Sequence, residues 1–261
     1  MKRRAFFGTT LGGLGMMAAP SSASAAEGKR TRIYVLENFY LQQGAQVARM
    51  HDYFSNIGLP ALTRVHQGPK IFLEALVAPH MPQMAAIVGH QSLEQMWDIH
   101  HKLAADKELS AAFEKWESAP EPAFDQASRT VLEATDYSPE VSALADPPKT
   151  PRIFELRVYH SPTWRQLKAL HERFAGPEIR IFHRVGIHPI LYTSTLIGAN
   201  LPSLTYLIPF ENLAAREKAW DAFGSDPEWQ KVRKESIEKH GQIASVIQIS
   251  LFKATAYSPI R

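Results

Sequence analysis

The chain has 261 residues, of which 45% are apolar and 21% charged, a composition typical of a globular protein with one or two domains. It contains no cysteine, which excludes disulfides, thiolate nucleophiles and cysteine-ligated zinc or iron–sulfur clusters. The formal net charge is +3 at pH 7.

Residues 1–25 have the pattern of a removable export signal. The basic pair Arg3-Arg4 precedes an apolar, glycine-rich run of about 15 residues, and Ala23 and Ala25 form an A-x-A cleavage pattern. The arginine pair and the weakly apolar run resemble a twin-arginine signal. The alternative, an N-terminal membrane anchor, would need about 20 apolar residues. We therefore expect a periplasmic or secreted mature protein without stable membrane insertion.

Cleavage of this segment would change the charge of the protein. It removes three of the 29 basic residues and no acidic one, which leaves 26 of each. No basic stripe or basic patch with interleaved aromatic residues is present in the sequence. The sequence therefore predicts no nucleic-acid partner.

The elements after the signal begin with a strand. Residues 32–40 alternate and are rich in β-branched and aromatic residues, as strands are. A helix should follow, because Val47, Met50, Phe54 and Ile57 are spaced by three and four residues. The same criteria predict further strands at 70–78, 83–90 and 129–137, and helices at 93–103 and 107–117.

The pattern of this first half recurs 120 residues later. "EATDYSPE" at 133–140 returns as "KATAYSPI" at 253–260. A local shift to 123 residues is needed only where Trp97 is aligned with Trp220. A period this long indicates a duplicated domain rather than a solenoid of short repeats. The second copy predicts strands at 152–160, 189–197, 203–210 and 247–257, and helices around 167–174, 213–223 and 228–238.

Each copy has the order β-α-β-β-α-β, which is the split βαβ or ferredoxin-like arrangement. The copies span residues 30–138 and 152–259. Between them, residues 139–151 are rich in proline, which neither a helix nor a central strand tolerates. We expect an α+β protein of two tandem ferredoxin-like domains joined by an extended linker.

The second copy contains four sequence segments that resemble those of a known family. "FELRVY", "VGIHPILYT", "LTYLIPFENLAAREKAWDAF" and "SDPEWQKVR" stand in that order. Together they resemble the NIPSNAP family, whose domains are similar to the dimeric α/β-barrel superfamily. The first copy departs from this pattern, with Glu37-Asn38 where the second has Arg157-Val158. It resembles a degenerate sister domain.

The resemblance implies a fold and a range of functions. The two copies are expected to pair their sheets within one chain, as a pseudo-dimer, so that the protein could be a monomer or a homo-oligomer. Family members are linked to small-molecule binding, membrane traffic and organelle quality control. Fold analogy alone is a weak warrant for function.

Alternation along the first strand of each copy suggests which residues face a barrel interior. In the second copy, Phe154, Leu156 and Val158 form an apolar set, which we expect to face the helices. The mixed polar set, which includes Glu155, Arg157 and Tyr159, should then point into the barrel.

The same alternation in the first copy directs Glu37 inward, at the position equivalent to Arg157. Two interpretations stay open: an ion pair between Glu37 and Arg157, or a polar anchor for a small acid. Tyr192 and Tyr206, on the second and third strands of the second copy, are candidates for the same interior. The candidate ligand site therefore consists of Arg157, Glu37, Glu155, Tyr159, Tyr192 and Tyr206.

His51 and His171 occupy one repeat position beside the apolar helix stripe. The superfamily resemblance implies that a helix-borne histidine could ligate haem. A hydrogen-bonded histidine at the edge of the core is the favoured alternative, because one histidine position without further ligands is a weak metal signal. We predict no cofactor and no metal site.

Three functions remain compatible with the sequence. The first is binding of a small anionic or carbonyl-bearing molecule in the barrel interior. The second is a cofactor-free or haem-dependent oxidoreductase, as other branches of the superfamily are. The third is a scaffold whose outer surface binds a protein partner. No nucleophile elbow, phosphate-cradling glycine loop or H-E-x-x-H helix favours a specific reaction.

Overall fold

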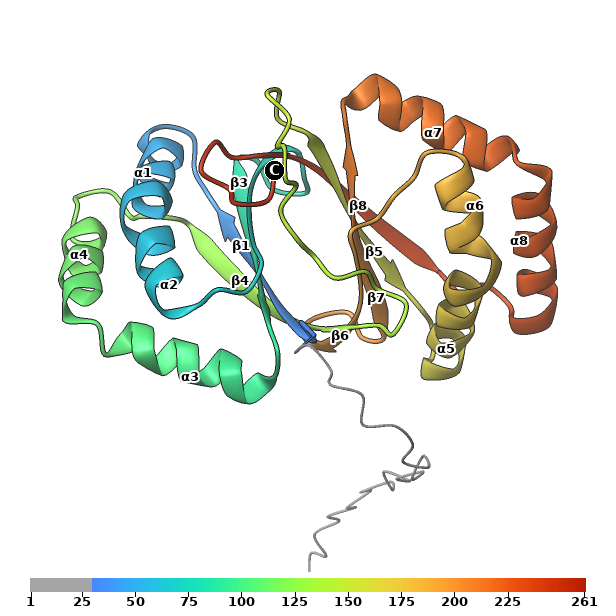
Figure 1. Ribbon diagram of the computed structural model, residues 1–261, viewed down its shortest axis with the longest axis horizontal. Helices are drawn as coiled ribbons and strands as arrows, with labels where there is room; N and C mark the ends of the chain where they lie inside the picture. The colour runs from blue at the N-terminus through green and yellow to red at the C-terminus, as the bar shows by residue number, and fades with distance from the viewer. Residues whose placement is uncertain (1–29) are drawn as a thin grey trace, which may run out of the picture.

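The computed structural model describes residues 30–261, so the predicted signal at 1–25 lies outside the described residues. Eight antiparallel strands form one closed barrel, in the order β1-β3-β2-β8-β5-β7-β6-β4. Helices flank it on two sides, α1–α4 on one and α5–α8 on the other (Figure 1). The strands are β1 (Ile33–Tyr40), β2 (Lys70–Val77), β3 (Gln83–His90), β4 (Gln126–Ala134), β5 (Ile153–His160), β6 (Leu191–Ile197), β7 (Ser203–Phe210) and β8 (Val246–Ala254).

The helices follow the predicted β-α-β-β-α-β order in both copies. The first predicted helix of each copy is divided into two α-helices by a π-helical turn, η1 (Phe54–Gly58) and η2 (Phe174–Glu178). Pro60 and Pro177 lie at or beside these turns, where the missing N–H disturbs a regular helix. The helices are α1 (Ala45–Tyr53), α2 (Leu59–Val65), α3 (Leu93–Ala104), α4 (Lys107–Glu117), α5 (Trp164–Arg173), α6 (Ile179–Arg184), α7 (Leu213–Ser225) and α8 (Pro227–His240).

The helix caps keep the 120-residue register throughout. Ser92 and Asn212 cap α3 and α7, and each side chain accepts a hydrogen bond from the backbone N–H three residues on. Asp106 and Asp226 cap α4 and α8 in the same way. The local shift of 123 residues expected at Trp97 is therefore wrong. It arose because two tryptophans at different positions of the helices were aligned with each other.

The two four-stranded halves meet along two seams. Within the first half the strand order is β2-β3-β1-β4, so β2 and β4 would be free edges. Instead β4 pairs with β6, and β2 pairs with β8, both antiparallel. The predicted pairing of the two copies within one chain is confirmed, and it occurs edge to edge.

The segment after β4 reinforces the first seam. The N–H of Thr135 donates to the carbonyl oxygen of Tyr192 at 3.0 Å, and the N–H of Tyr192 donates to Ser138 Oγ at 3.0 Å. The hydroxyl of Tyr137 lies 2.6 Å from Nδ1 of His171, on a helix of the other half. The last strand was expected to extend to residue 137, but its end leaves the sheet to make these contacts.

The segment after β8 repeats these contacts at the second seam. The N–H of Thr255 donates to the carbonyl oxygen of Phe72 at 2.9 Å, and the N–H of Phe72 donates to Ser258 Oγ at 2.9 Å. Tyr257 lies 3.2 Å from Nδ1 of His51. The segment at 133–140 therefore recurs at 253–260 because each copy stabilises one seam by contacts with the other copy.

Apolar side chains form three separate cores. One fills the barrel interior and includes Tyr34, Leu36, Phe154 and Leu156. A second lies between the sheet of the second half and α5–α8, and a third lies between the sheet of the first half and its helices. Within residues 30–261, no helix is long and apolar enough to cross a membrane.

Substituting Ser138 or Ser258 by alanine should weaken a seam. Each change leaves a buried backbone N–H without its acceptor, which costs about 1–3 kcal/mol in the free energy of unfolding. Chemical denaturation of both variants measures the loss, with the exposed Ser142→Ala as the control. Losses no larger than that of the control would show that these hydrogen bonds do not stabilise the seams.

Candidate functional site

The two faces of β5 are oriented opposite to the prediction. Phe154 and Leu156 belong to the core inside the barrel. Glu155 contacts Arg216 and Trp220 of α7, so the polar set faces the helices. The expectation was wrong because it assumed that the interior is the more polar environment. Apolar side chains from the strands of both halves fill most of that interior. On the outer face, α7 supplies partners for the charged side chains.

Glu155 and Arg157 form a buried cluster with α7. Glu155 is fully buried and accepts hydrogen bonds from Arg216 Nε at 2.6 Å and from Trp220 Nε1 at 2.9 Å. Arg157 Nη1 lies 3.1 Å from Glu155 Oε1, and the Arg157 guanidinium stands 4.0 Å from the centre of the Trp220 ring. The Glu155 carboxylate is thus held by two arginines and Trp220, whereas the buried Nε of Arg157 makes no hydrogen bond with any of residues 30–261.

The three candidate tyrosines lie in the same layer, between the sheet and α5–α8. Tyr206 donates to the hydroxyl of Tyr159 at 2.8 Å, and its ring stacks on Tyr192 with centroids 5.8 Å apart. Burial raises the pKa of Tyr206 well above its ordinary value. The structure therefore brings Arg157, Glu155, Tyr159, Tyr192 and Tyr206 together, but outside the barrel interior.

Glu37 does not join this group. It faces the helices of the first half, at the position equivalent to Arg157, and pairs with Arg129 through a hydrogen bond from Nε of 2.7 Å. The proposed ion pair between Glu37 and Arg157 is wrong, because each has a partner in its own half.

His51 and His171 act in the seams. Nδ1 of each bonds a tyrosine of the other copy, as described above. Nε2 of His171 lies 2.8 Å from Ser194 Oγ, and Nε2 of His51 lies 3.3 Å from Glu74 Oε2. Neither histidine offers a free ring nitrogen to a haem iron. Among residues 30–261, no three histidine, aspartate or glutamate side chains gather as metal ligands would.

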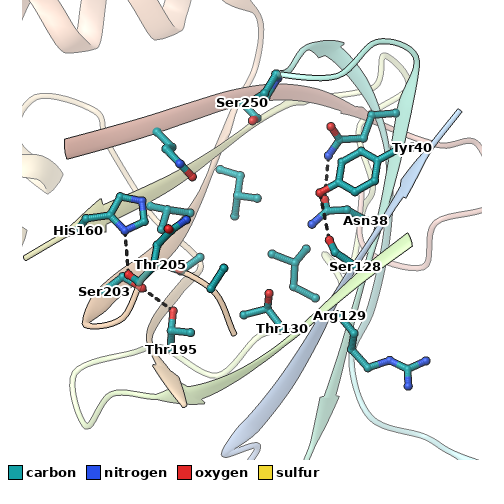
Figure 2. A pocket seen from close by; sticks show the side chains of 18 residues that line it. Asn38, Tyr40, Ser128, Arg129, Thr130, His160, Thr195, Ser203, Thr205 and Ser250 are labelled. Carbon is teal, nitrogen blue, oxygen red and sulfur yellow. Dashed lines mark hydrogen bonds between the residues drawn. The ribbon is translucent and has the colours of Figure 1, made fainter. Parts of the chain in front are cut away.

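A cavity of about 360 Å³ opens at one end of the barrel interior. Figure 2 shows His160, Ser203 and Thr205 on one side of it and Asn38, Tyr40 and Ser128 on the other. Arg129, at the rim, points away from the cavity and towards its partner Glu37. The lining is thus mostly uncharged and rich in hydrogen-bonding groups.

Hydrogen bonds between side chains on neighbouring strands order this lining. Tyr40 and Ser128 share a hydrogen bond of 3.0 Å, and Ser203 donates to Thr195 Oγ1 at 2.8 Å. Gln83 donates through Nε2 to Asn38 Oδ1 at 2.8 Å. A rigid set of hydroxyl and amide groups therefore surrounds the space.

Two buried polar atoms of the lining have no partner within the described part of the chain. They are Oε1 of Gln83 and Nε2 of His160. Nδ1 of His160 lies 2.9 Å from the carbonyl oxygen of Asn200, so Nδ1 carries the proton. In the neutral ring Nε2 is then an acceptor, as is the amide oxygen of Gln83.

The sequence contains a signal for this site at the ends of the strands. Asn38 and Tyr40 continue the inward-facing set of Leu36, and His160 continues that of Leu156. The polar residues at the end of an apolar set mark the mouth of the barrel. The prediction considered the middle of each strand and missed its end.

Glu155→Gln should be far more destabilising than Glu37→Gln. The first change breaks a buried charge cluster, which typically costs about 3–5 kcal/mol in the free energy of unfolding. The second breaks a pair whose arginine is 61% exposed, which costs at most about 1 kcal/mol. Urea denaturation compares the two. Equal losses would contradict the assignment of Glu155 as the centre of the buried cluster.

Residues 154–259 match the model of the NIPSNAP family. No curated protein matches the chain. Among solved structures, an anthrone oxidase-like protein is 13% identical, with a TM-score of 0.53, over 86% of this chain and 92% of that one. A structure named as a candidate monooxygenase from Lactobacillus acidophilus NCFM is 10% identical, with a TM-score of 0.53, over 86% of this chain and 94% of that one.

A NIPSNAP-like domain protein from Burkholderia xenovorans is 26% identical over 41% of this chain and 89% of that one, with a TM-score of 0.36. The two full-length likenesses show the fold alone, an α/β barrel made here from two ferredoxin-like halves of one chain. The NIPSNAP family model thus covers the second half of the chain, and residues 154–259 form a NIPSNAP domain.

Proposed function

We propose that the protein binds a small, uncharged, hydroxyl- or amide-bearing molecule in the mouth of the barrel. The observation that carries this proposal is the pair of unpartnered buried acceptors, Gln83 Oε1 and His160 Nε2, on the wall of the 360 Å³ cavity. A buried acceptor without a partner costs about 1–3 kcal/mol, so a ligand that donates to it recovers that free energy. The volume lies within the range of small-molecule sites.

The position of the charges argues for an uncharged ligand. Arg157, the expected anchor of an anion, lies on the far side of the sheet among α5–α8. The two unpartnered atoms are hydrogen-bond acceptors. A carboxylate is also only an acceptor, so it cannot bond to either of them. A hydroxyl or amide N–H of the ligand would complement both. A ligand carbonyl would accept from whichever hydroxyl of the Tyr40–Ser128 pair does not donate within that pair.

Oxidoreductase chemistry has weaker support. The solved structures named for oxidase or monooxygenase activity resemble this chain at 10–13% identity, which carries the fold but no reaction. The export expected from residues 1–25 would place the binding protein in the periplasm or outside the cell.

A melting screen of the full chain tests the proposal. The panel pairs uncharged polyols, sugars and amides with carboxylates of matched size. We expect the uncharged compounds to raise the melting temperature. Gln83→Met and His160→Phe each remove one acceptor and should weaken binding about tenfold, equivalent to about 1.4 kcal/mol.

The exposed Gln43→Met serves as the control and should bind as the wild type does. Stabilisation by carboxylates alone would overturn the proposal. So would a ligand whose affinity is the same in both acceptor variants as in the wild type.

A further inference from the structure

A second cavity of about 370 Å³ lies on the opposite face of the sheet, between the first half of the barrel and α3. Its walls are largely apolar and include Leu62, Val88 and Ile99. The Glu37–Arg129 pair lies at its edge. It is separate from the mouth cavity, because its strand residues belong to the outward-facing set.

The repeat shows what the second copy holds at the same place. There Glu155, Arg157, Arg216 and Trp220 form the buried cluster described above. Phe182 packs against Trp220 with ring centroids 5.6 Å apart. This space is filled by side chains of the protein itself.

The first copy lacks every member of that cluster. The positions 120 residues earlier hold Val35, Glu37, Met96 and His100, and all four line the second cavity. Leu62 stands where the second copy has Phe182. Loss of the large rings and of the charged cluster therefore leaves a cavity where the sister copy is solid.

One polar group in this cavity has no partner. His90 is 5% exposed, and its Nδ1 makes no hydrogen bond with any of residues 30–261. Phe210 occupies the equivalent position of the second copy. Burial, together with the neighbouring His66 and Lys70, lowers the pKa of His90 to about 4. The ring is therefore neutral near pH 7 and can donate or accept one hydrogen bond.

The outer edge of the cavity is aromatic. Trp97 is 57% exposed, which is unusual for so large an apolar side chain. His100 stacks against it with centroids 5.4 Å apart and planes 24° apart. These flat, exposed rings offer a stacking surface for a flat molecule.

We propose that this cavity binds a small planar aromatic molecule that carries one hydroxyl or carbonyl group. The ring system packs between the apolar walls and Trp97, and the oxygen bonds the His90 imidazole. Chemically this ligand differs from the polar one proposed for the barrel mouth. The first copy, which departs from the family pattern, then holds a second binding site besides the one in the barrel mouth.

Isothermal titration of the full chain with 1-naphthol tests the proposal, with naphthalene as the matched probe without an oxygen. We expect 1-naphthol to bind the wild type at least about tenfold more tightly than naphthalene does. His90→Phe places the residue of the second copy at this position and should abolish that preference. His100→Trp restores the ring of the second copy at an exposed position and should weaken binding of both probes.

The exposed Gln43→Met, which lies outside both cavities, is the control and should bind 1-naphthol as the wild type does. Absence of binding to the wild type would overturn the inference, as would unchanged binding in both His90→Phe and His100→Trp. Melting curves verify that each variant is folded.

Discussion

The structure depends on the pairing of four strand edges along two seams. A four-stranded half with free edges at β2 and β4 would expose unpaired backbone groups on both sides, which invites association with other chains. Closure with β8 and β6 satisfies those groups within one molecule. The repeated tyrosine and serine contacts then fasten each seam to a helix and a strand of the opposite half. Neither half can be completed without the other.

This closure gives the interior two different ends. At one end the chain that leaves each seam inserts Val141 and Ile260 into the apolar core, which closes the barrel. At the other end the inward-facing positions become polar, and the cavity opens. The twofold relation of the halves is not kept in the residues there: Tyr40 in one half corresponds to His160 in the other. A duplicated chain can thus build an asymmetric site that two identical subunits could not.

Much of the fold was predictable because its evidence is local or repeated. Hydrophobic periodicity gave the strands and helices, and the 120-residue repeat gave the two halves and their pairing. The direction of the strand faces was not predictable by the same means. Glu155 and Arg157 are stable beside the helices only because Arg216 and Trp220 lie opposite them, some 60 residues away in the chain. Alternation distinguishes two faces, but it does not say which face meets which partner.

The sequence predicted a site in the barrel interior but not the residues that line it. The reason is again that alternation does not tell which face of a strand points inward. A charge on a strand was taken as the sign of a ligand, yet the charged residues are those that the protein pairs with itself. The unpartnered polar atoms of the two cavities belong instead to Gln83, His160 and His90, and they can be identified only when all neighbours are placed.

The two halves also differ in what lies between sheet and helices. In the second half, which matches the family model, Arg157, Arg216 and Trp220 surround the buried carboxylate of Glu155 in that layer. In the first half the same positions hold smaller or uncharged side chains. Because the seams rather than this layer join the halves, the barrel is closed although the first half lacks the buried cluster. Duplication separates the requirement for closure, which both copies still meet, from the packing of the outer layer, in which one copy is free to change.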